Sequence, residues 1–343
     1  MSVFAHPEFD GHEQVVFSQN QTDGLRVIIA VHDTQRGPAL GGCRIWPYAS
    51  EAEALTDVLR LAKGMSYKAA LADLPLGGGK SVVLADSRTD KTPAMMRALG
   101  RAVERLGGRY IVAEDVGATV ADMDIVASET AHVSGISGTV GDPSPWTAEG
   151  VFRALEAAVG HRLGTGLAGV RIALSGLGAV GSGVAERAAA AGARLTVADL
   201  RAEAVRPFAE RGAEVADPQA IHTAEADVFA PCALGAVLSA RTIPEIRARI
   251  VCGAANNQLA SAEDDARLAH AGILYCPDYL VNAGGLISVA RPKTGLSDAE
   301  ALAKRDAIPA TLLDVLAIAE RDRVPPGEAA DRLARARLGP TAR

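Results

Sequence analysis

The stretch that decides the fold of half the chain is 170–199, VRIALSGLGAVGSGVAERAAAAGARLTVAD. Its apolar opening, 170–175, predicts a short buried strand that runs directly into a GxGxxG turn at 176–181. A helix over 182–190 and a second strand over 194–198 follow, and that strand ends on Asp199. Strand, glycine turn, helix, strand and terminal carboxylate, in this order, are the context that a dinucleotide-binding turn requires. We therefore expect a doubly wound Rossmann domain.

Each glycine of the turn has a distinct expected role. Gly176 makes the tight turn, Gly178 lets a pyrophosphate approach, and Gly181 packs the helix on the strand. The helix N-terminus faces the phosphate charge. Asp199 would accept a hydrogen bond from a ribose 2′-hydroxyl and repel a 2′-phosphate, which favours NAD over NADP. Arg201 leaves that preference open, and a glycine-rich turn without a ligand is the alternative that the order of elements disfavours.

Composition excludes several classes of function. The 343 residues are enough for two domains, and 48% hydrophobic with 22% charged residues describe an ordinary globular protein. A net charge of −6 gives no electrostatic footprint for nucleic acid. No apolar run is long enough to span a membrane, so we expect no membrane partner. The opening MSVFAHPEFDGHEQ has neither a basic start nor an apolar segment, and we expect no signal peptide.

The cysteines and histidines predict no metal site. The four cysteines are widely spaced and form no CxxC pair, which indicates reduced, buried thiols in a cytoplasmic protein. The seven histidines include no close pair of the HExxH kind.

The rest of the chain predicts an α/β fold with two domains and the active site in the cleft between them. Strands are expected over 13–18, 25–32, 81–85 and 110–113, and helices starting at the capping box Ser50–Glu53, at Thr92 and at Ala121. The segment 135–145, GISGTVGDPSP, is dense in glycine, proline and serine and predicts a domain boundary. A helix over 148–159, opened by Thr147, should follow, and the helix over 301–320 should break or kink at Pro309. We expect a substrate domain over 1–135, a dinucleotide domain over 136–324, and a C-terminal helix over 325–343 that packs back on the first.

Two lysines mark the candidate chemistry in the segment 64–81, GMSYKAALADLPLGGGKS. Three glycines precede Lys80, and an apolar run follows it, so Lys80 should stand at the mouth of a buried strand. A dehydrated ammonium beside a second cation, Lys68, loses its proton more readily and can act as a base. The alternative is two surface charges flanking a glycine loop, and this segment alone leaves both readings open. A phosphate loop is excluded because Leu74 replaces its first glycine and a strand follows Ser81.

Seven segments together resemble the amino acid dehydrogenases of the glutamate, leucine, phenylalanine and valine dehydrogenase family, most closely its leucine dehydrogenase branch. They are 40–44 (LGGCR), 63–68 (KGMSYK), 76–80 (LGGGK), 114–117 (EDVG), the turn at 176–181, 254–257 (AANN) and 282–285 (NAGG). The resemblance covers essentially the whole chain. It implies NAD-dependent oxidative deamination of an L-2-amino acid to the 2-oxo acid, ammonia and NADH, and the reverse reductive amination.

The resemblance also implies residue roles. Lys68 would hold the substrate carboxylate with help from Asn282, Lys80 would be the general base, and Asp115 would shuttle protons to and from the amine. The residues implied to line the substrate site are Leu40, Gly41, Gly42, Met65, Ala113, Leu286 and Val289. Those implied to contact the cofactor are Thr147, Gly176, Leu177, Gly178, Ala179, Val180, Gly181, Asp199, Leu200, Cys232, Ala233, Ala254, Asn256 and Asn257.

The pocket residues favour a branched-chain substrate. Glutamate-using members have a lysine at the position of Leu40 and a hydroxyl residue at the position of Val289. In this chain a glutamate γ-carboxylate would therefore be buried without a partner, at a cost of roughly several kcal/mol. Phenylalanine-using members tend to have smaller residues at Leu40, Ala113 and Leu286, which favours leucine, valine or isoleucine. Phenylalanine stays the alternative, and a catalytically silent NAD-binding relative a remote one. We expect a homo-oligomer.

Overall fold

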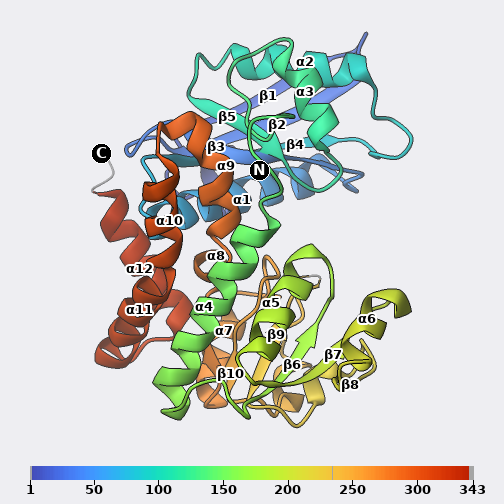
Figure 1. Cartoon of the computed structure of the whole chain (residues 1–343). Helices are drawn as coiled ribbons and strands as arrows, with labels where there is room; N and C mark the ends of the chain where they lie inside the picture. The colour runs from blue at the N-terminus through green and yellow to red at the C-terminus, as the bar shows by residue number, and fades with distance from the viewer. Residues whose placement is uncertain (1, 234, 340–343) are drawn as a thin grey trace. The chain divides into compact units, whose positions relative to one another are not determined.

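The computed structural model describes residues 2–233 and 235–339. It contains two β-sheets, each with its own helices (Figure 1). The chain divides into two compact units, the first made of Met1–Gly141, Val289–Asp298 and Ala334–Arg343, the second of Asp142–Ser288 and Ala299–Leu333. The predicted α/β class with one doubly wound sheet is confirmed, whereas the domain limits 1–135, 136–324 and 325–343 stay a prediction.

The sheet of the first unit is mixed. Its order is β1-β2-β4-β3-β5. The strands are β1 (Gln14–Asn20), β2 (Leu25–Asp33), β4 (Gly77–Leu84), β3 (Ala39–Trp46) and β5 (Tyr110–Glu114). β2 is antiparallel to both of its neighbours, whereas β3 runs parallel to both β4 and β5. The carboxyl ends of β3, β4 and β5 therefore lie at one edge of the sheet.

Helices cover both faces of this sheet, as Figure 1 shows for α1 (Glu51–Leu71) below it and α2 (Pro93–Glu104) and α3 (Val120–Ala127) above it. Alternate residues of β2 are buried against the two faces. Ile28 and Ala30 pack in the core with α1, and Val27 and Ile29 pack in the core with α2 and α3. A strand buried on both sides reads as a continuous apolar run, which is what its sequence has.

The cap of α1 confirms the expected start of that helix. The Ser50 hydroxyl accepts from the backbone N–H of Glu53 at 3.1 Å, and the Glu53 carboxylate accepts from Ala49 N at 3.0 Å. The helix continues to Leu71, so Lys68 lies in its last turn.

Lys80 was expected at the mouth of a strand over 81–85, and this is wrong, because β4 already begins at Gly77. The three glycines before Lys80 therefore belong to the strand. Their role is to allow close approach of neighbouring backbone. A Cβ on Gly77 would lie 1.8 Å from Asp33 O, and one on Gly78 would lie 1.9 Å from Ser66 N. Lys80 is therefore in the middle of a strand that α1 crosses at backbone distance.

Two later stretches of the chain complete the first unit. The carbonyl of Val289 accepts from Ser134 Oγ at 2.8 Å. The Arg335 guanidinium donates to the Tyr67 hydroxyl at 2.7 Å, and the Arg337 guanidinium donates to Leu71 O at 2.8 Å. Val289 belongs to α9 (Gly284–Thr294), and Arg335 and Arg337 belong to α12 (Pro326–Leu338).

The second unit contains a six-stranded, fully parallel sheet of order β11-β10-β9-β6-β7-β8. The strands are β6 (Arg171–Ser175), β7 (Arg194–Ala198), β8 (Glu214–Val215), β9 (Val228–Pro231), β10 (Ile250–Val251) and β11 (Leu274–Tyr275). The remaining α-helices are α4 (Ser144–Leu163), α5 (Ala179–Ala190), α6 (Ala202–Ala209), α7 (Glu263–His270), α8 (Asp278–Val281), α10 (Asp298–Asp306) and α11 (Ile308–Asp322). The chain winds outward from β6 to one edge and then from β9 to the other. The switch point of this doubly wound sheet is therefore between β6 and β9.

Two expectations for the helices of this unit are corrected. α4 starts at Ser144, so Thr147 does not open the helix but lies in its first turn, where its hydroxyl donates to Pro143 O at 3.2 Å. Pro309 does not kink a long helix; it occupies the first turn of α11, a separate helix from α10. Proline suits that place because the first helical N–H groups have no partner within the helix.

Candidate active site

Lys80 and Asp115 lie in direct contact. Lys80 Nζ is 2.7 Å from Asp115 Oδ2, and the lysine side chain is 7% exposed. Lys80 comes from β4 and Asp115 follows the last residue of β5, with β3 between the two strands. The sheet order thus joins two residues that are far apart in the sequence.

Two cations share one oxygen of Asp115. Arg44 Nε lies 3.2 Å from the same Oδ2 that contacts Lys80. Burial alone would raise the pKa of Asp115, but Lys80 and Arg44 outweigh that effect and lower it. Asp115 is therefore ionised near neutral pH. Lys68 as the second cation beside Lys80 stays a prediction, and the second cation in contact with Asp115 is Arg44.

The glycine pair of β3 flanks the two charged residues. A Cβ on Gly41 would lie 1.7 Å from Gly79 O, and one on Gly42 would lie 2.7 Å from the Cβ of Asp115. Any side chain at either position would push the strand away from Lys80 or Asp115. Gly42 pairs in register with Ala113.

The other expected substrate residues of the first unit lie close by. Leu40 pairs with Gly78 and is 2% exposed, and a Cβ on Gly41 would approach Met65 Cγ to 3.4 Å. Lys68 is half-buried in the last turn of α1. The structure therefore gathers Leu40, Gly41, Gly42, Met65 and Ala113 around β3 and β4.

Sequence reasoning missed two functional neighbours. Arg44 stood in the LGGCR segment without a role, and Tyr110 was seen only as the start of a strand. The Tyr110 hydroxyl is buried and donates to Gly41 O at 2.7 Å, which fixes the glycine pair from behind. A buried tyrosine needs such an acceptor, but the sequence does not say which one.

The glycine turn of the second unit has the geometry that phosphate binding requires. Gly176 has φ +92°, and a Cβ on Gly181 would lie 2.0 Å from Gly176 O, so both glycines are obligatory for the tight turn. Gly178 differs, because a Cβ built on it meets no atom within 4 Å. It is the N-cap of α5, whose first turn includes Ala179 and Val180. Open space at a helix N-terminus fits a pyrophosphate.

Asp199 is held beside this turn at the carboxyl end of β7. The backbone N–H of Leu177 donates to Asp199 Oδ2 at 2.7 Å, and Arg201 Nε donates to Oδ1 at 3.2 Å. Burial would raise the pKa of Asp199, but the hydrogen bonds from Arg201 and Leu177 lower it. Leu200, between them, is 87% exposed. The carboxylate has the place expected of a ribose-binding acid.

Most of the remaining expected cofactor residues follow the carboxyl ends of β9 and β10. A Cβ on Gly176 would lie 2.7 Å from Ala233 N, and the Cys232 thiol accepts from Ala254 N at 3.4 Å. Asn257 has φ +52°. A Cβ on Gly285 would meet the Thr147 hydroxyl at 2.7 Å, and one on Gly183 of α5 would lie 2.8 Å from the Cβ of the next residue, Ala148.

Asn282 uses both protons of its amide within the second unit. Its Nδ2 donates to Ala254 O at 3.2 Å and to Asn256 Oδ1 at 2.9 Å. Its Oδ1 is buried and has no hydrogen-bond partner among the described residues. To donate to a carboxylate, Nδ2 would have to leave one of these acceptors, so the expected carboxylate role stays a prediction.

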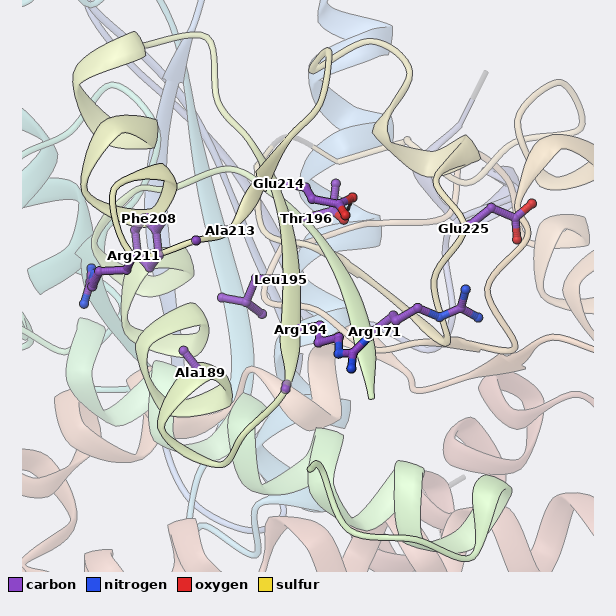
Figure 2. Close-up of a pocket in the computed structure, with 12 residues that line it drawn as sticks. Arg171, Ala189, Arg194, Leu195, Thr196, Phe208, Arg211, Ala213, Glu214 and Glu225 are labelled. Atoms are coloured by element: carbon purple, nitrogen blue, oxygen red, sulfur yellow. Dashed lines mark hydrogen bonds between the residues drawn. The ribbon is translucent and has the colours of Figure 1, made fainter. Parts of the chain in front are cut away.

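The cavity in Figure 2 is not part of this site. It has a volume of about 590 Å³ and is lined by residues that include Arg171, Arg194 and Arg211. Arg171 and Arg194 are the first residues of β6 and β7. The cavity thus opens at the amino ends of these strands, opposite to the edge that carries Gly176 and Asp199.

Comparison with known proteins decides the family. A model described as Glu/Leu/Phe/Val dehydrogenase, dimerisation domain, matches residues 12–132, and one described as Glutamate/Leucine/Phenylalanine/Valine dehydrogenase matches residues 196–291. Leucine dehydrogenase of Geobacillus stearothermophilus is 47% identical, with 98% of this chain and 94% of the relative covered. The chain belongs to the Glu/Leu/Phe/Val dehydrogenase family. The predicted resemblance is confirmed.

Further relatives show the breadth of this family. Valine dehydrogenase of Streptomyces coelicolor is 46% identical over 97% of this chain and 94% of the relative. The solved structure of L-tryptophan dehydrogenase from Nostoc punctiforme is 42% identical, with a TM-score of 0.84 and 96% of each chain covered. The chain is thus an amino acid dehydrogenase, an oxidoreductase of a kind that uses a nicotinamide cofactor.

Two kinds of feature are absent from the described residues. None of the helices in residues 2–233 and 235–339 combines the length and hydropathy that a bilayer-crossing segment needs. Within the same residues, no group of three or more His, Cys, Asp or Glu side chains is arranged to ligate a metal.

Proposed function

We propose that this family member catalyses the NAD-dependent oxidative deamination of leucine, valine or isoleucine to the 2-oxo acid, ammonia and NADH, and the reverse reductive amination. The observation that carries the chemistry is the contact of 2.7 Å between Lys80 Nζ and Asp115 Oδ2. The substrate class is supported by relatives named leucine and valine dehydrogenase at 46–48% identity over nearly the whole chain.

The nicotinamide, when bound, supplies the chemistry of hydride acceptance from the substrate Cα. Lys68 binds the substrate carboxylate with Asn282. Asp115 takes a proton from the substrate ammonium. Uncharged Lys80 takes a proton from the water that attacks the imino carbon. Asp115 returns its proton to the amine, ammonia leaves as the carbonyl forms, and Asp115, ionised again, accepts the remaining hydroxyl proton. Two groups of opposite charge in contact suit this exchange because each can transfer a proton over hydrogen-bond distance.

The apolar character of the substrate residues supports a branched-chain side chain. Leu40, Met65, Ala113 and Val289 of the first unit carry no charge, and neither does Leu286 of the second. Leu40, Ala113 and Leu286 are buried. A γ-carboxylate placed among such residues would lose its hydration without gaining a partner, which costs several kcal/mol.

NAD is the proposed cofactor because Asp199 carries a charge that opposes a 2′-phosphate. The turn that precedes it leaves open space at Gly178. Arg201 is engaged by Asp199 and so offers less positive charge to a phosphate.

Assembly and compartment complete the proposal. The match to a dimerisation domain over 12–132 supports a homo-oligomer. All four cysteines are free thiols, which suits a reducing compartment and supports a cytoplasmic location.

A substrate panel tests the proposed activity. Initial rates of NADH formation at 340 nm would be measured with L-leucine, L-valine, L-isoleucine, L-phenylalanine, L-tryptophan and L-glutamate, each with NAD and NADP. We expect the highest kcat/KM for a branched-chain substrate with NAD. A preference for an aromatic substrate would support the second candidate, which the tryptophan dehydrogenase likeness favours. A protein that binds NAD but oxidises none of the six would be a silent relative.

Removal of the base tests the site itself. Lys80→Ala should lower kcat by at least 10²-fold while leaving NAD affinity, measured by fluorescence titration, nearly unchanged. Lys91→Ala is the matched control, because Lys91 makes a similar pair with Asp122 at 2.7 Å in the same unit. Near-normal turnover of Lys80→Ala, or an equal loss in Lys91→Ala, would contradict the role given to Lys80.

A further inference from the structure

Arg44 bridges two carboxylates beside the candidate site. Its Nε lies 3.2 Å from Asp115 Oδ2, and its NH1 nitrogen lies 2.8 Å from Asp57 Oδ2. Arg44 follows Cys43, which pairs in register with Glu114, the residue before Asp115. The parallel pairing of β3 and β5 therefore puts the guanidinium next to the carboxylate.

Asp57 is itself held in place. It belongs to α1, and its Oδ2 accepts from the Tyr48 hydroxyl at 2.6 Å. Arg60 approaches its other oxygen at 3.5 Å. Burial raises the pKa of Tyr48, and Asp57 raises it further, so the phenol keeps its proton and remains a donor. Tyr48 and Asp57 thus anchor the end of the guanidinium that does not touch Asp115.

The charge on Arg44 is permanent, whereas the charge on Lys80 is not. Burial alone would lower the pKa of Arg44, but Asp115 and Asp57 outweigh it and raise that pKa. An arginine does not lose its proton near neutral pH. Lys80 must be uncharged before it can act as a base, and in that starting state ionised Asp115 has lost the attraction of one of its two cations.

The other titratable groups near Asp115 do not replace that attraction. Burial raises the pKa of Cys43 to about 12. Burial also raises the pKa of Tyr110 well above its usual value. Both are therefore neutral, and Arg44 is a cation that stays in contact with Asp115 Oδ2 when Lys80 has given up its proton.

We propose that Arg44 is a positioning residue that keeps Asp115 ionised and in place while Lys80 is uncharged, and that Asp57 and Tyr48 hold Arg44 for this task. This inference rests on the proposed function, because it assigns Arg44 a part in the same proton exchange.

The test compares two replacements of Arg44. Arg44→Gln removes the charge, so Asp115 should bind a proton more readily. The acidic limb of the pH profile of kcat/KM should then move to higher pH by about one unit, which corresponds to a tenfold change in the proton affinity of Asp115. Arg44→Lys keeps the positive charge but lacks the second guanidinium nitrogen that reaches Asp57. The acidic limb of its pH profile should lie nearer to that of the parent. Tyr48→Phe removes the anchor and should give a smaller shift in the direction of Arg44→Gln.

A matched control separates this effect from lost packing. Arg101→Gln removes another arginine of the first unit that bridges two carboxylates, Asp23 at 2.6 Å and Glu129 at 3.2 Å. It should leave the pH profile unchanged, even if thermal stability falls. A parental pH profile in Arg44→Gln, or an equal shift in Arg101→Gln, would overturn the proposal.

A second measurement needs no turnover. The carboxyl carbon of Asp115 can be followed by NMR on protein labelled with ¹³C-aspartate, with Asp115→Asn to assign the signal. Titration at higher pH in Arg44→Gln than in the parent supports the proposal, and an identical titration refutes it. If the parent oxidises no amino acid, the proposed function fails, and this titration still decides whether Arg44 sets the charge of Asp115.

Discussion

At Gly78 the backbone of α1 closely approaches β4 behind the candidate site, and a single methyl group there should disable the enzyme. The Cβ of Gly78→Ala would lie 1.9 Å from Ser66 N and 2.5 Å from Ser66 Cα. These are backbone atoms of α1, so no rotamer change can relieve the overlap. Lys80 follows Gly78 by two residues in β4, and Lys68 follows Ser66 by two in α1.

The magnitude follows from this distance. Packed heavy atoms need a separation of about 3.5 Å, so the strand and the helix must separate by more than about 1 Å. Overpacking of this kind costs roughly 1–3 kcal/mol of stability. A displacement of about 1 Å at groups that position a substrate can cost on the order of 10²-fold in rate. We therefore expect a loss of about 100-fold in kcat/KM, with a protein that is destabilised but folded.

The assay is NADH formation at saturating NAD, together with urea unfolding followed by circular dichroism. Gly64→Ala is the control, because Gly64 lies within the same helix α1 and a Cβ there meets no atom within 4 Å. It should gain about 0.5–1 kcal/mol of stability and keep its activity. Parental kcat/KM in Gly78→Ala would refute the idea that this backbone approach positions the two lysines.

Two further predictions concern charge. Burial raises the pKa of Asp265 to about 6, so the native state binds more protons than the unfolded chain between about pH 4 and 6. The free energy of unfolding should therefore fall as pH rises through that window, by at most about 3 kcal/mol. Urea unfolding at pH 4.5 and 7.5 should show this fall in the parent and not in Asp265→Asn. The same fall in both proteins would contradict the prediction. At the cofactor turn, Asp199→Ala should raise the KM for NAD by about 10- to 100-fold. It should also lower the ratio of kcat/KM with NAD to kcat/KM with NADP. Arg201→Ala should raise that ratio, and identical NAD/NADP ratios in both variants would exclude this pair from cofactor choice.

The local parts of the fold could be predicted from the sequence. β7 has the expected limits of 194–198, and the glycine turn before α5 has the expected geometry at Gly176 and Gly181. Both depend on residues close in the chain, where apolar runs and glycine conformations determine the backbone. The pair Lys80–Asp115 was expected through the family resemblance, and the parallel pairing of β3 with β4 and β5 supplies its physical cause.

Features that depend on distant packing were missed or misjudged. The strand that carries Lys80 was expected to begin after it because the apolar run begins at Ser81, whereas β4 already begins at Gly77, where Gly77 and Gly78 make room for Asp33 and Ser66. The partners of Arg44 lie 13 and 71 residues away, and no periodicity in the sequence connects them. One sequence can indicate that a charged residue needs a partner, but the fold chooses the partner.

The three-part composition of the first unit has a consequence for dissecting this enzyme. A fragment that stops at Gly141 would lack the Val289 carbonyl that receives Ser134 and the guanidinium groups that reach Tyr67 and Leu71. No single truncation of the gene can deliver this half with all its hydrogen bonds intact. An independent version would have to be joined from three coding segments, with one linker in place of residues 142–288 and another in place of residues 299–333.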